Sequence, residues 1–229
     1  MNKIIKKIEH KVIVSVQASH GEPFYKKECM AAMMQSAING GAAGLRVAGA
    51  EDISLATSLT DIPIIGITKP DPLPENWKDI VYITPDFQSA KSISNADIIA
   101  IDGTSRKRLH ENLADLTDKI HNDLNRPVMA DISTLEEGLS AALLGADIIS
   151  TTLSGYTTNT IEKDNGLPDF ELLEKLVSSI KLPIILEGRV WSPEDVKKAF
   201  ELGAYAVVIG SAITRPHLIT KRFVNITGE

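Results

Sequence analysis

The sequence predicts an α/β fold of the (β/α)8 TIM-barrel type, and three features of its 229 residues support this prediction. Short apolar runs rich in β-branched residues, typical of buried parallel strands, alternate with amphipathic segments of helical period. The last two runs each end in a glycine, Gly188 and Gly210, and one helix-length segment separates them. Because the length suits one barrel, we expect a single domain over residues 1–229.

Eight apolar runs qualify as strands, and they are spread over the whole chain. They are residues 12–17, 44–47, 62–68, 98–102, 128–131, 148–152, 184–187 and 207–210. A further apolar run, residues 80–84, falls between the third and fourth strands, and we interpret it as a short excursion or as a strand extending that unit. An open, doubly wound sheet is the nearest alternative, but its G-x-G-x-x-G turn does not follow the first strand.

The clearest helix start lies between the last two strands. Ser192 suits the cap position, Pro193 suits the first turn, and the two acids that follow suit the positive end of the helix dipole. An apolar face of Val196, Ala199 and Phe200 comes next, and Gly203 ends the helix. These signals predict a complete strand–helix–strand unit at the end of the chain.

A second helix follows the fifth strand. Ser133 and Glu136 have the spacing of a capping box, which predicts that the helix begins at Ser133. Its apolar face is expected to comprise Leu135, Leu139, Ala142 and Leu143, and Gly145 follows it.

Composition limits the classes of function. The net charge of −6 argues against nucleic acids or anionic membranes as partners, and no apolar run approaches the length of a membrane span. A lone cysteine, Cys29, is typical of a reducing compartment, so we expect a cytoplasmic protein. Metal-ligand spacing is absent among His10, His20, His110, His121 and His217, and we expect no metal and no cofactor.

Nearly every predicted strand ends in a polar or ionisable residue. These residues are Gln17, Arg46, Lys69, Asp102, Asp131, Thr151 with Thr152, Glu187, and Gly210 with Ser211. Buried ionic groups cost free energy unless they are paired, so stability alone does not call for this set. Since the carboxyl ends of barrel strands meet at one face, the pattern predicts a convergent polar site.

Two of these residues are candidates for proton transfer or covalent catalysis. Lys69 is either a buried amine, acting as a base or Schiff-base former, or a solvated lysine on the rim. Glu187 is either a general acid or base or the ion-pair partner of Arg189 or Arg46. Asp131 and Asp102 could orient substrate hydroxyls or fix a lysine, or they could only start a helix and a turn.

The glycines at the ends of the last two strands suit a phosphate group. Glycine lets backbone N–H groups approach an anion closely, and a following helix N-terminus adds positive charge. Arg46 and Arg215 are candidates for clamping the phosphate, because guanidinium matches its geometry. The alternative is an ordinary α/β unit whose glycines only make turns.

Taken together, these segments resemble the N-acetylmannosamine-6-phosphate 2-epimerase family. The resemblance is carried by residues 17–23, 44–46, 63–69, 83–85, 130–134, 145–156, 187–189 and 210–216, in this order. It implies a TIM barrel that interconverts N-acetylmannosamine 6-phosphate and N-acetylglucosamine 6-phosphate in sialic-acid and amino-sugar breakdown. It also implies substrate binding by Gln17, Arg46, Asp131 and Arg215, and phosphate binding by the backbone of Gly188, Arg189, Gly210 and Ser211.

Inversion at C2 of such a sugar needs two proton-transfer groups on opposite faces, and Lys69 and Glu187 end the third and seventh strands. We predict that they are the catalytic pair, with Lys69 as base and Glu187 as acid. Two alternatives stay open: a Schiff-base aldolase acting on a keto sugar phosphate, and a phosphosugar-binding barrel without catalysis. We also expect a homodimer, in which residues 218–223 could pack on the partner.

Overall fold

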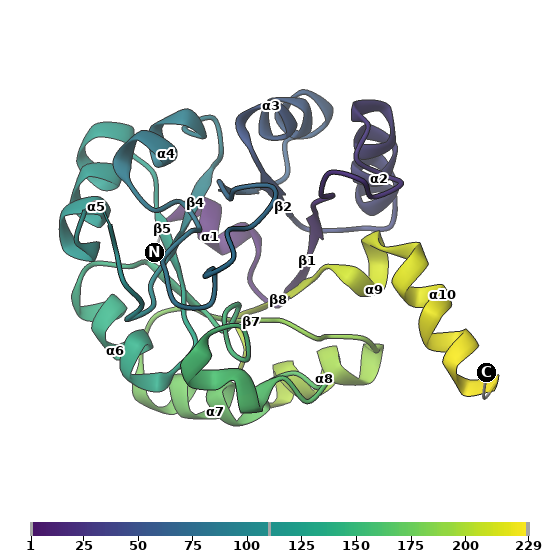
Figure 1. Cartoon of the computed structure of the whole chain (residues 1–229). Helices are drawn as coiled ribbons and strands as arrows, with labels where there is room; N and C mark the ends of the chain where they lie inside the picture. The colour runs from purple at the N-terminus through teal and green to yellow at the C-terminus, as the bar shows by residue number, and fades with distance from the viewer. Residues whose placement is uncertain (1, 110, 228–229) are drawn as a thin grey trace.

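The computed structural model describes residues 2–109 and 111–227. In this part of the chain, eight parallel strands form a closed barrel in sequential order, with helices around it (Figure 1). The strands are β1 (Lys11–Val16), β2 (Leu45–Ala48), β3 (Ile64–Ile67), β4 (Ile98–Asp102), β5 (Val128–Asp131), β6 (Ile148–Ser150), β7 (Ile184–Glu187) and β8 (Ala206–Ile209). The predicted TIM-barrel fold is confirmed.

All eight predicted strands are present, and β4, β5 and β7 have the predicted bounds. The apolar run 80–84 is an excursion and not a strand. Within the described residues, its one ladder contact is an isolated bridge between Ile80 and Lys107. The backbone N–H of Thr84 donates to the carbonyl of Thr68 over 2.9 Å, which returns the chain to the end of β3.

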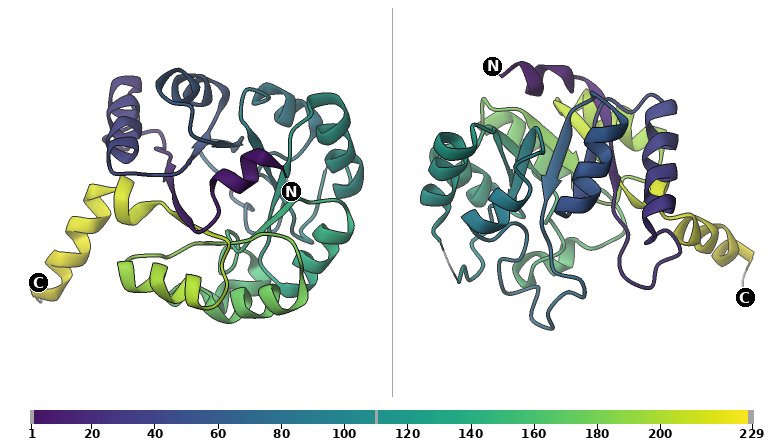
Figure 2. Two further views of the ribbon diagram at one scale, coloured as in Figure 1. Left: turned by 180° about the vertical axis from the view of Figure 1, so that it is seen from behind. Right: turned by 90° about the horizontal axis from the view of Figure 1, so that it is seen from above.

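Helices occupy the outside of the barrel and close one end of it (Figures 1 and 2). They are α1 (Lys3–Lys7), α2 (Lys27–Asn39), α3 (Ala50–Leu59), α4 (Phe87–Ser92), α5 (Leu113–Lys119), α6 (Leu135–Leu143), α7 (Phe170–Ser179), α8 (Pro193–Glu201), α9 (Ser211–Thr214) and α10 (Pro216–Val224). A π-helical turn (Ile120–Leu124) extends α5, and 3-10 turns cover Thr158–Lys163 and Asn225–Thr227. Ile5 of α1 and the adjacent Ile8 belong to the apolar cluster inside the barrel, so α1 closes its amino end.

Helix α8 follows the prediction. The Ser192 side chain accepts from the N–H of Asp195, and Asp195 accepts from that of Ser192, which makes a capping box. Ala199 is fully buried, and Val196 and Phe200 pack against the same cluster. Gly203 ends the helix with a φ of +91°, in the left-handed region that glycine tolerates best.

Helix α6 differs from the prediction at both its start and its face. The capping box joins Thr134 and Glu137, one residue later than expected, because Glu137 and not Glu136 turns back to the cap. Leu139 and Leu143, predicted to be buried, are 39% and 89% exposed. The buried face instead presents Gly138 and Ala141, with Leu135 and Ala142 packed at its margin.

The small residues allow a close helix–helix contact. A Cβ added at Gly138 would lie 2.5 Å from Leu176 Cδ2 of α7, so any larger residue would separate the two helices. The close approach of α7 therefore decides which face of α6 is buried.

Helix α10 projects away from the barrel (Figures 1 and 2). It contains no buried residue. Near its end, Phe223 is 71% exposed and Val224 is 49% exposed, and Ile226 beyond it is 82% exposed. An exposed apolar surface of this kind is typical of a site of association.

Candidate active site

A cavity of about 600 Å³ opens at the carboxyl ends of the strands. Of the residues predicted to bind or convert substrate, all but Asp131 gather there, while Asp102 and Thr151, which also end predicted strands, do not line the cavity. Gln17, Arg46, Lys69, Glu187, Gly188, Arg189, Gly210, Ser211 and Arg215 all line the cavity. Asp131 is fully buried and lies behind Arg46, so its predicted contact with substrate stays a prediction.

A buried ion-pair chain links β2, β5 and β7. Arg46 Nη2 lies 2.5 Å from Asp131 Oδ2, and Arg46 Nη1 lies 3.0 Å from Asp131 Oδ1 and 2.9 Å from Glu187 Oε2. The hydroxyl of Thr152 donates to Asp131 over 2.7 Å and to Glu187 over 3.2 Å. Two carboxylates therefore share one guanidinium, which offsets part of the cost of their burial.

This ion-pair chain bears on two questions left open by the sequence, the partner of Glu187 and the role of Arg46. Glu187 is the partner of Arg46, while Arg189 donates to the backbone carbonyls of Leu167 and Ser154. Arg46 is 1% exposed and both of its terminal nitrogens engage carboxylates, which leaves little of the guanidinium for a phosphate, and its predicted contact with substrate stays a prediction.

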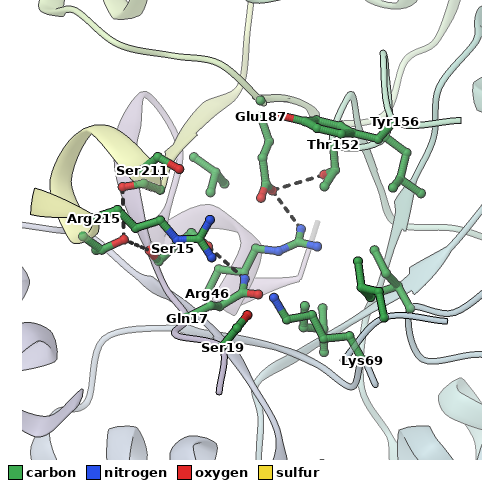
Figure 3. A pocket seen from close by; sticks show the side chains of 18 of the residues that line it. Ser15, Gln17, Ser19, Arg46, Lys69, Thr152, Tyr156, Glu187, Ser211 and Arg215 are labelled. Atoms are coloured by element: carbon green, nitrogen blue, oxygen red, sulfur yellow. Dashed lines mark hydrogen bonds and ion pairs between the residues drawn. The ribbon is translucent and has the colours of Figure 1, made fainter. Parts of the chain in front are cut away.

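Lys69 follows β3 and extends into the cavity (Figure 3). Burial lowers the pKa of its amine, and the positive charges of Arg215 and Arg46 lower it further, against the opposing effect of Asp71 and Glu22. A lysine with a lowered pKa has a larger neutral fraction at neutral pH, and only the neutral amine accepts a proton. The buried-amine interpretation of Lys69 therefore agrees with its surroundings.

Glu187 ends β7 and faces the same space from the opposite wall, with the guanidinium of Arg46 between it and Lys69 in Figure 3. Burial raises the pKa of Glu187 to about 7, and Asp131 contributes in the same direction. Arg46, the hydroxyl of Thr152 and Lys69 oppose this rise. The carboxyl can thus hold or release a proton near neutral pH.

The predicted phosphate cradle lies at the ends of β7 and β8. Gly188 and Arg189 have φ values of +109° and +55°, a backbone turn that takes the chain away from the strand direction. Among the described residues, none accepts a hydrogen bond from the backbone N–H of Gly188, Arg189, Gly210 or Ser211. These amides are available to an anion.

Arg215 adds a cation next to the cradle. Its Nε lies 3.5 Å from Glu22 Oε1, and both side chains are partly exposed. Figure 3 places Arg215 and Ser211 on one side of the cavity and Lys69 on another, with Gln17 between them. Gln17 donates to the hydroxyl of Ser15 over 2.9 Å, so this pair forms part of the floor.

Asp102, the other carboxylate that we considered, does not line the cavity. It is fully buried and forms an ion pair with Arg106, and its Oδ1 accepts from the hydroxyl of Thr104 over 2.6 Å. Its role is therefore structural.

The prediction missed several lining residues, of which Ser15, Tyr82 and Tyr156 are the most prominent. Tyr156 lies in one of the segments that carry the family resemblance, and Tyr82 lies in the apolar run 80–84. Because that run was ambiguous between strand and excursion, its sequence did not indicate that Tyr82 reaches the cavity.

Within residues 2–109 and 111–227, no group of three or more His, Cys, Asp or Glu side chains is placed to hold a metal ion. His110, one of the five histidines considered, lies outside the described residues. In the same part of the chain, no helix is both long and apolar enough to cross a membrane.

Comparison with known proteins points to one family. The family model described as "Putative N-acetylmannosamine-6-phosphate epimerase" matches residues 30–229. A Clostridium perfringens (strain SM101) protein named "Putative N-acetylmannosamine-6-phosphate 2-epimerase" is 48% identical over 96% of this chain and 97% of its own. A protein of the same name from Caldanaerobacter subterraneus subsp. tengcongensis is 45% identical over 99% of this chain and 94% of its own.

Comparison with solved structures points to the same family. The structure of the N-acetylmannosamine-6-phosphate 2-epimerase from Clostridium perfringens superposes with a TM-score of 0.91 at 45% identity, covering 98% of this chain and 96% of that one. A thiamine phosphate pyrophosphorylase from Pyrococcus furiosus, at 17% identity and a TM-score of 0.60, shares the fold alone.

Proposed function

The chain belongs to the N-acetylmannosamine-6-phosphate epimerase family, and on that premise we propose that it interconverts N-acetylmannosamine 6-phosphate and N-acetylglucosamine 6-phosphate. The two sugars differ only in configuration at C2. The observation that carries the proposal is the placement of one partly buried amine, Lys69, and one partly buried carboxyl, Glu187, in the same cavity. We assign the reaction to the breakdown of sialic acids and amino sugars.

The chemistry starts from the open-chain aldehyde. Its carbonyl group at C1 acidifies the hydrogen at C2, and loss of that proton leaves an enediolate-like state with charge spread onto the oxygen. Return of a proton to the opposite face inverts C2. No electron is transferred, so the steps require only an acid, a base and donors for the developing oxyanion.

Lys69 and Glu187 suit these two steps. The lowered pKa of Lys69 favours the neutral amine, which is the form that accepts the C2 proton. The raised pKa of Glu187 favours the carboxylic acid, which is the form that donates a proton from the other wall. In the reverse direction each group starts in the opposite protonation state, and the pair titrates as a unit.

The remaining predicted residues hold either the substrate or the catalytic carboxyl in this account. The backbone amides of Gly188, Arg189, Gly210 and Ser211 bind the 6-phosphate, and Arg215 supplies a countercharge. Arg46 holds Glu187 in place, and Asp131 fixes Arg46 from behind. Gln17, on the floor of the cavity, donates to a substrate oxygen.

The test is hydrogen exchange at C2, followed by proton NMR of N-acetylmannosamine 6-phosphate in heavy water. The wild-type protein is expected to incorporate deuterium at C2 and to produce the glucosamine epimer. Lys69→Ala is expected to abolish both. Exchange at the wild-type rate in Lys69→Ala would rule out Lys69 as the base, and binding without exchange in the wild-type protein would favour the non-catalytic barrel.

We also propose that the protein is a homodimer and that it acts in the cytoplasm. The exposed apolar end of α10 supports the first proposal, because a second copy could cover Phe223, Val224 and Ile226. The free thiol of Cys29 supports the second, since it fits a reducing compartment.

A further inference from the structure

The segment between β3 and α4 forms one wall of the cavity. Four of its apolar side chains, Leu73, Trp77, Tyr82 and Ile83, line the cavity, as does Lys69 at its start. The two ends of the segment are joined, because the N–H of Thr84 donates to the Thr68 carbonyl and the N–H of Thr68 donates to the Thr84 hydroxyl. This closure brings residue 83 back beside residue 69, so Lys69 emerges next to the apolar wall.

A buried arginine fixes the wall from outside the cavity. The guanidinium of Arg106 lies over the ring of Tyr82, with its carbon 5.2 Å from the ring centroid. Arg106 also pairs with Asp102, donates to the Thr104 hydroxyl over 2.9 Å, and donates to the Trp77 carbonyl over 2.7 Å. With every arm of the guanidinium engaged, the ring above it has a defined position.

Trp77 holds the ring of Tyr82 from another direction. The two rings meet edge to face, with centroids 6.1 Å apart and an interplanar angle of 88°. The segment is tied down further where Thr158 Oγ1 donates to Asp79 over 2.7 Å. The wall is therefore built before substrate arrives, which lowers the entropic cost of recognition.

The hydroxyl of Tyr82 is free for a ligand. Among the described residues it has no hydrogen-bond partner, and its oxygen is not enclosed away from solvent. Burial raises the pKa of Tyr82 to about 12, so the hydroxyl stays a neutral donor. Tyr82 lines the same cavity as Arg46 and Glu187, so one ligand can contact all three residues.

The position of this wall relative to C2 indicates which group of the substrate contacts it. Under the proposed function, the phosphate occupies the ends of β7 and β8, and Lys69 reaches C2. The acetamido group is bonded to C2, so it lies beside the segment from which Lys69 emerges. Its methyl is the one apolar group of the substrate, and its carbonyl accepts a hydrogen bond.

We propose that Tyr82 recognises the acetamido group of the substrate: its hydroxyl donates to the acetamido carbonyl, while Trp77, Leu73 and Ile83 surround the methyl. This inference rests on the proposed function. It assigns the part of the site that distinguishes an N-acyl sugar phosphate from a sugar phosphate with a hydroxyl at C2. Arg106 is a positioning residue in this account, because it acts on the substrate only through the ring of Tyr82.

The test is a comparison of two ligands that cannot react. 2-Acetamido-2-deoxy-D-mannitol 6-phosphate has no C1 carbonyl, and D-mannitol 6-phosphate is the same chain with a hydroxyl in place of the acetamide. The wild-type protein is expected to bind the acetamido ligand about tenfold more tightly by calorimetry, as one or two additional contacts allow. Tyr82→Phe is expected to lose most of this difference without weakening the binding of D-mannitol 6-phosphate.

Tyr25→Phe is the matched control, because Tyr25 is exposed and does not line this cavity. It is expected to bind both ligands as the wild-type protein does. Equal affinities of the wild-type protein for the two ligands would overturn the inference, as would an equal loss for both ligands in Tyr82→Phe, or no loss for either. Deuterium exchange at C2 in the wild-type protein decides the proposed function separately, since the two ligands here have no acidic C2 hydrogen.

Discussion

Arg46 Nη1 lies 2.9 Å from Glu187 Oε2, while the other side of the same guanidinium is bound by Asp131. One cation thus serves two carboxylates, and it cannot fully compensate both. The carboxylate nearer the cavity keeps a raised pKa, at about 7, mainly because of its burial and with a contribution from Asp131. Burial, with the help of Asp131 and against the opposing effect of Arg46, therefore lets Glu187 hold a proton near neutral pH.

The first prediction concerns pH. We expect kcat/KM for epimerisation of N-acetylmannosamine 6-phosphate to be bell-shaped. It falls at low pH because Lys69 gains a proton, and it falls at high pH because Glu187 loses the proton that it donates. Glu187→Gln stays neutral at every pH, so it is expected to lower the rate about 100-fold and to lack the basic limb. A basic limb that persists in Glu187→Gln would assign it to another group.

The second prediction separates the structural role of the buried chain from its chemical role. Asp131→Asn leaves the charge of Arg46 poorly compensated, and we expect the free energy of unfolding to fall by about 3 kcal/mol in urea titrations. The double variant Arg46→Met with Asp131→Leu removes the cation and one of its two carboxylates, and Glu187, whose pKa is already raised, remains as the neutral acid. This variant is expected to regain stability to within about 1 kcal/mol of the wild type and to remain inactive. Restored activity in the double variant would show that the ion pair between Arg46 and Asp131 is not needed for catalysis.

Much of the barrel could be predicted from local sequence. The bounds of β4, β5 and β7 are as predicted, because a strand buried on both faces is a continuous apolar run with polar residues at its ends. The start and end of α8 were also predictable, since Ser192, Pro193 and Gly203 each act through the adjacent backbone. These signals depend only on residues that are close in the sequence.

Features that depend on tertiary contacts could not be predicted. Ser133 and Thr134 each precede a glutamate at capping-box spacing, and only the fold decides that Thr134 is the cap. Leucines were expected inside α6, but the closeness of Leu176 requires Gly138 there. The same limit applies to the site, where the lining residues after β3 were missed because the path of residues 80–84 is set by long-range bonds.

The third prediction concerns the turn after α8. Gly203 has a φ of +91°, and an added Cβ would lie 2.8 Å from Val177 Cγ1. Gly203→Ala is therefore expected to lower the free energy of unfolding by about 2 kcal/mol, from backbone strain and steric overlap together. Gly166→Ala is the control, because Gly166 has a similar φ of +80° but no atom within 4 Å of the added Cβ. Equal losses in urea titrations would attribute the whole effect to backbone strain.

The last prediction concerns the projecting helix. Phe223 is 71% exposed at the end of α10, in a helix with no buried residue, and an exposed apolar surface of this kind is typical of an interface that another molecule covers. We expect sedimentation equilibrium to give the mass of a dimer for the wild-type protein and of a monomer for Phe223→Glu, because an uncompensated carboxylate opposes burial. Leu143→Glu is the control, since Leu143 is also exposed but lies on α6, and it is expected to remain dimeric. Dissociation of Leu143→Glu with a dimeric Phe223→Glu would instead locate the interface on α6. A monomeric wild-type protein would contradict the proposed dimer.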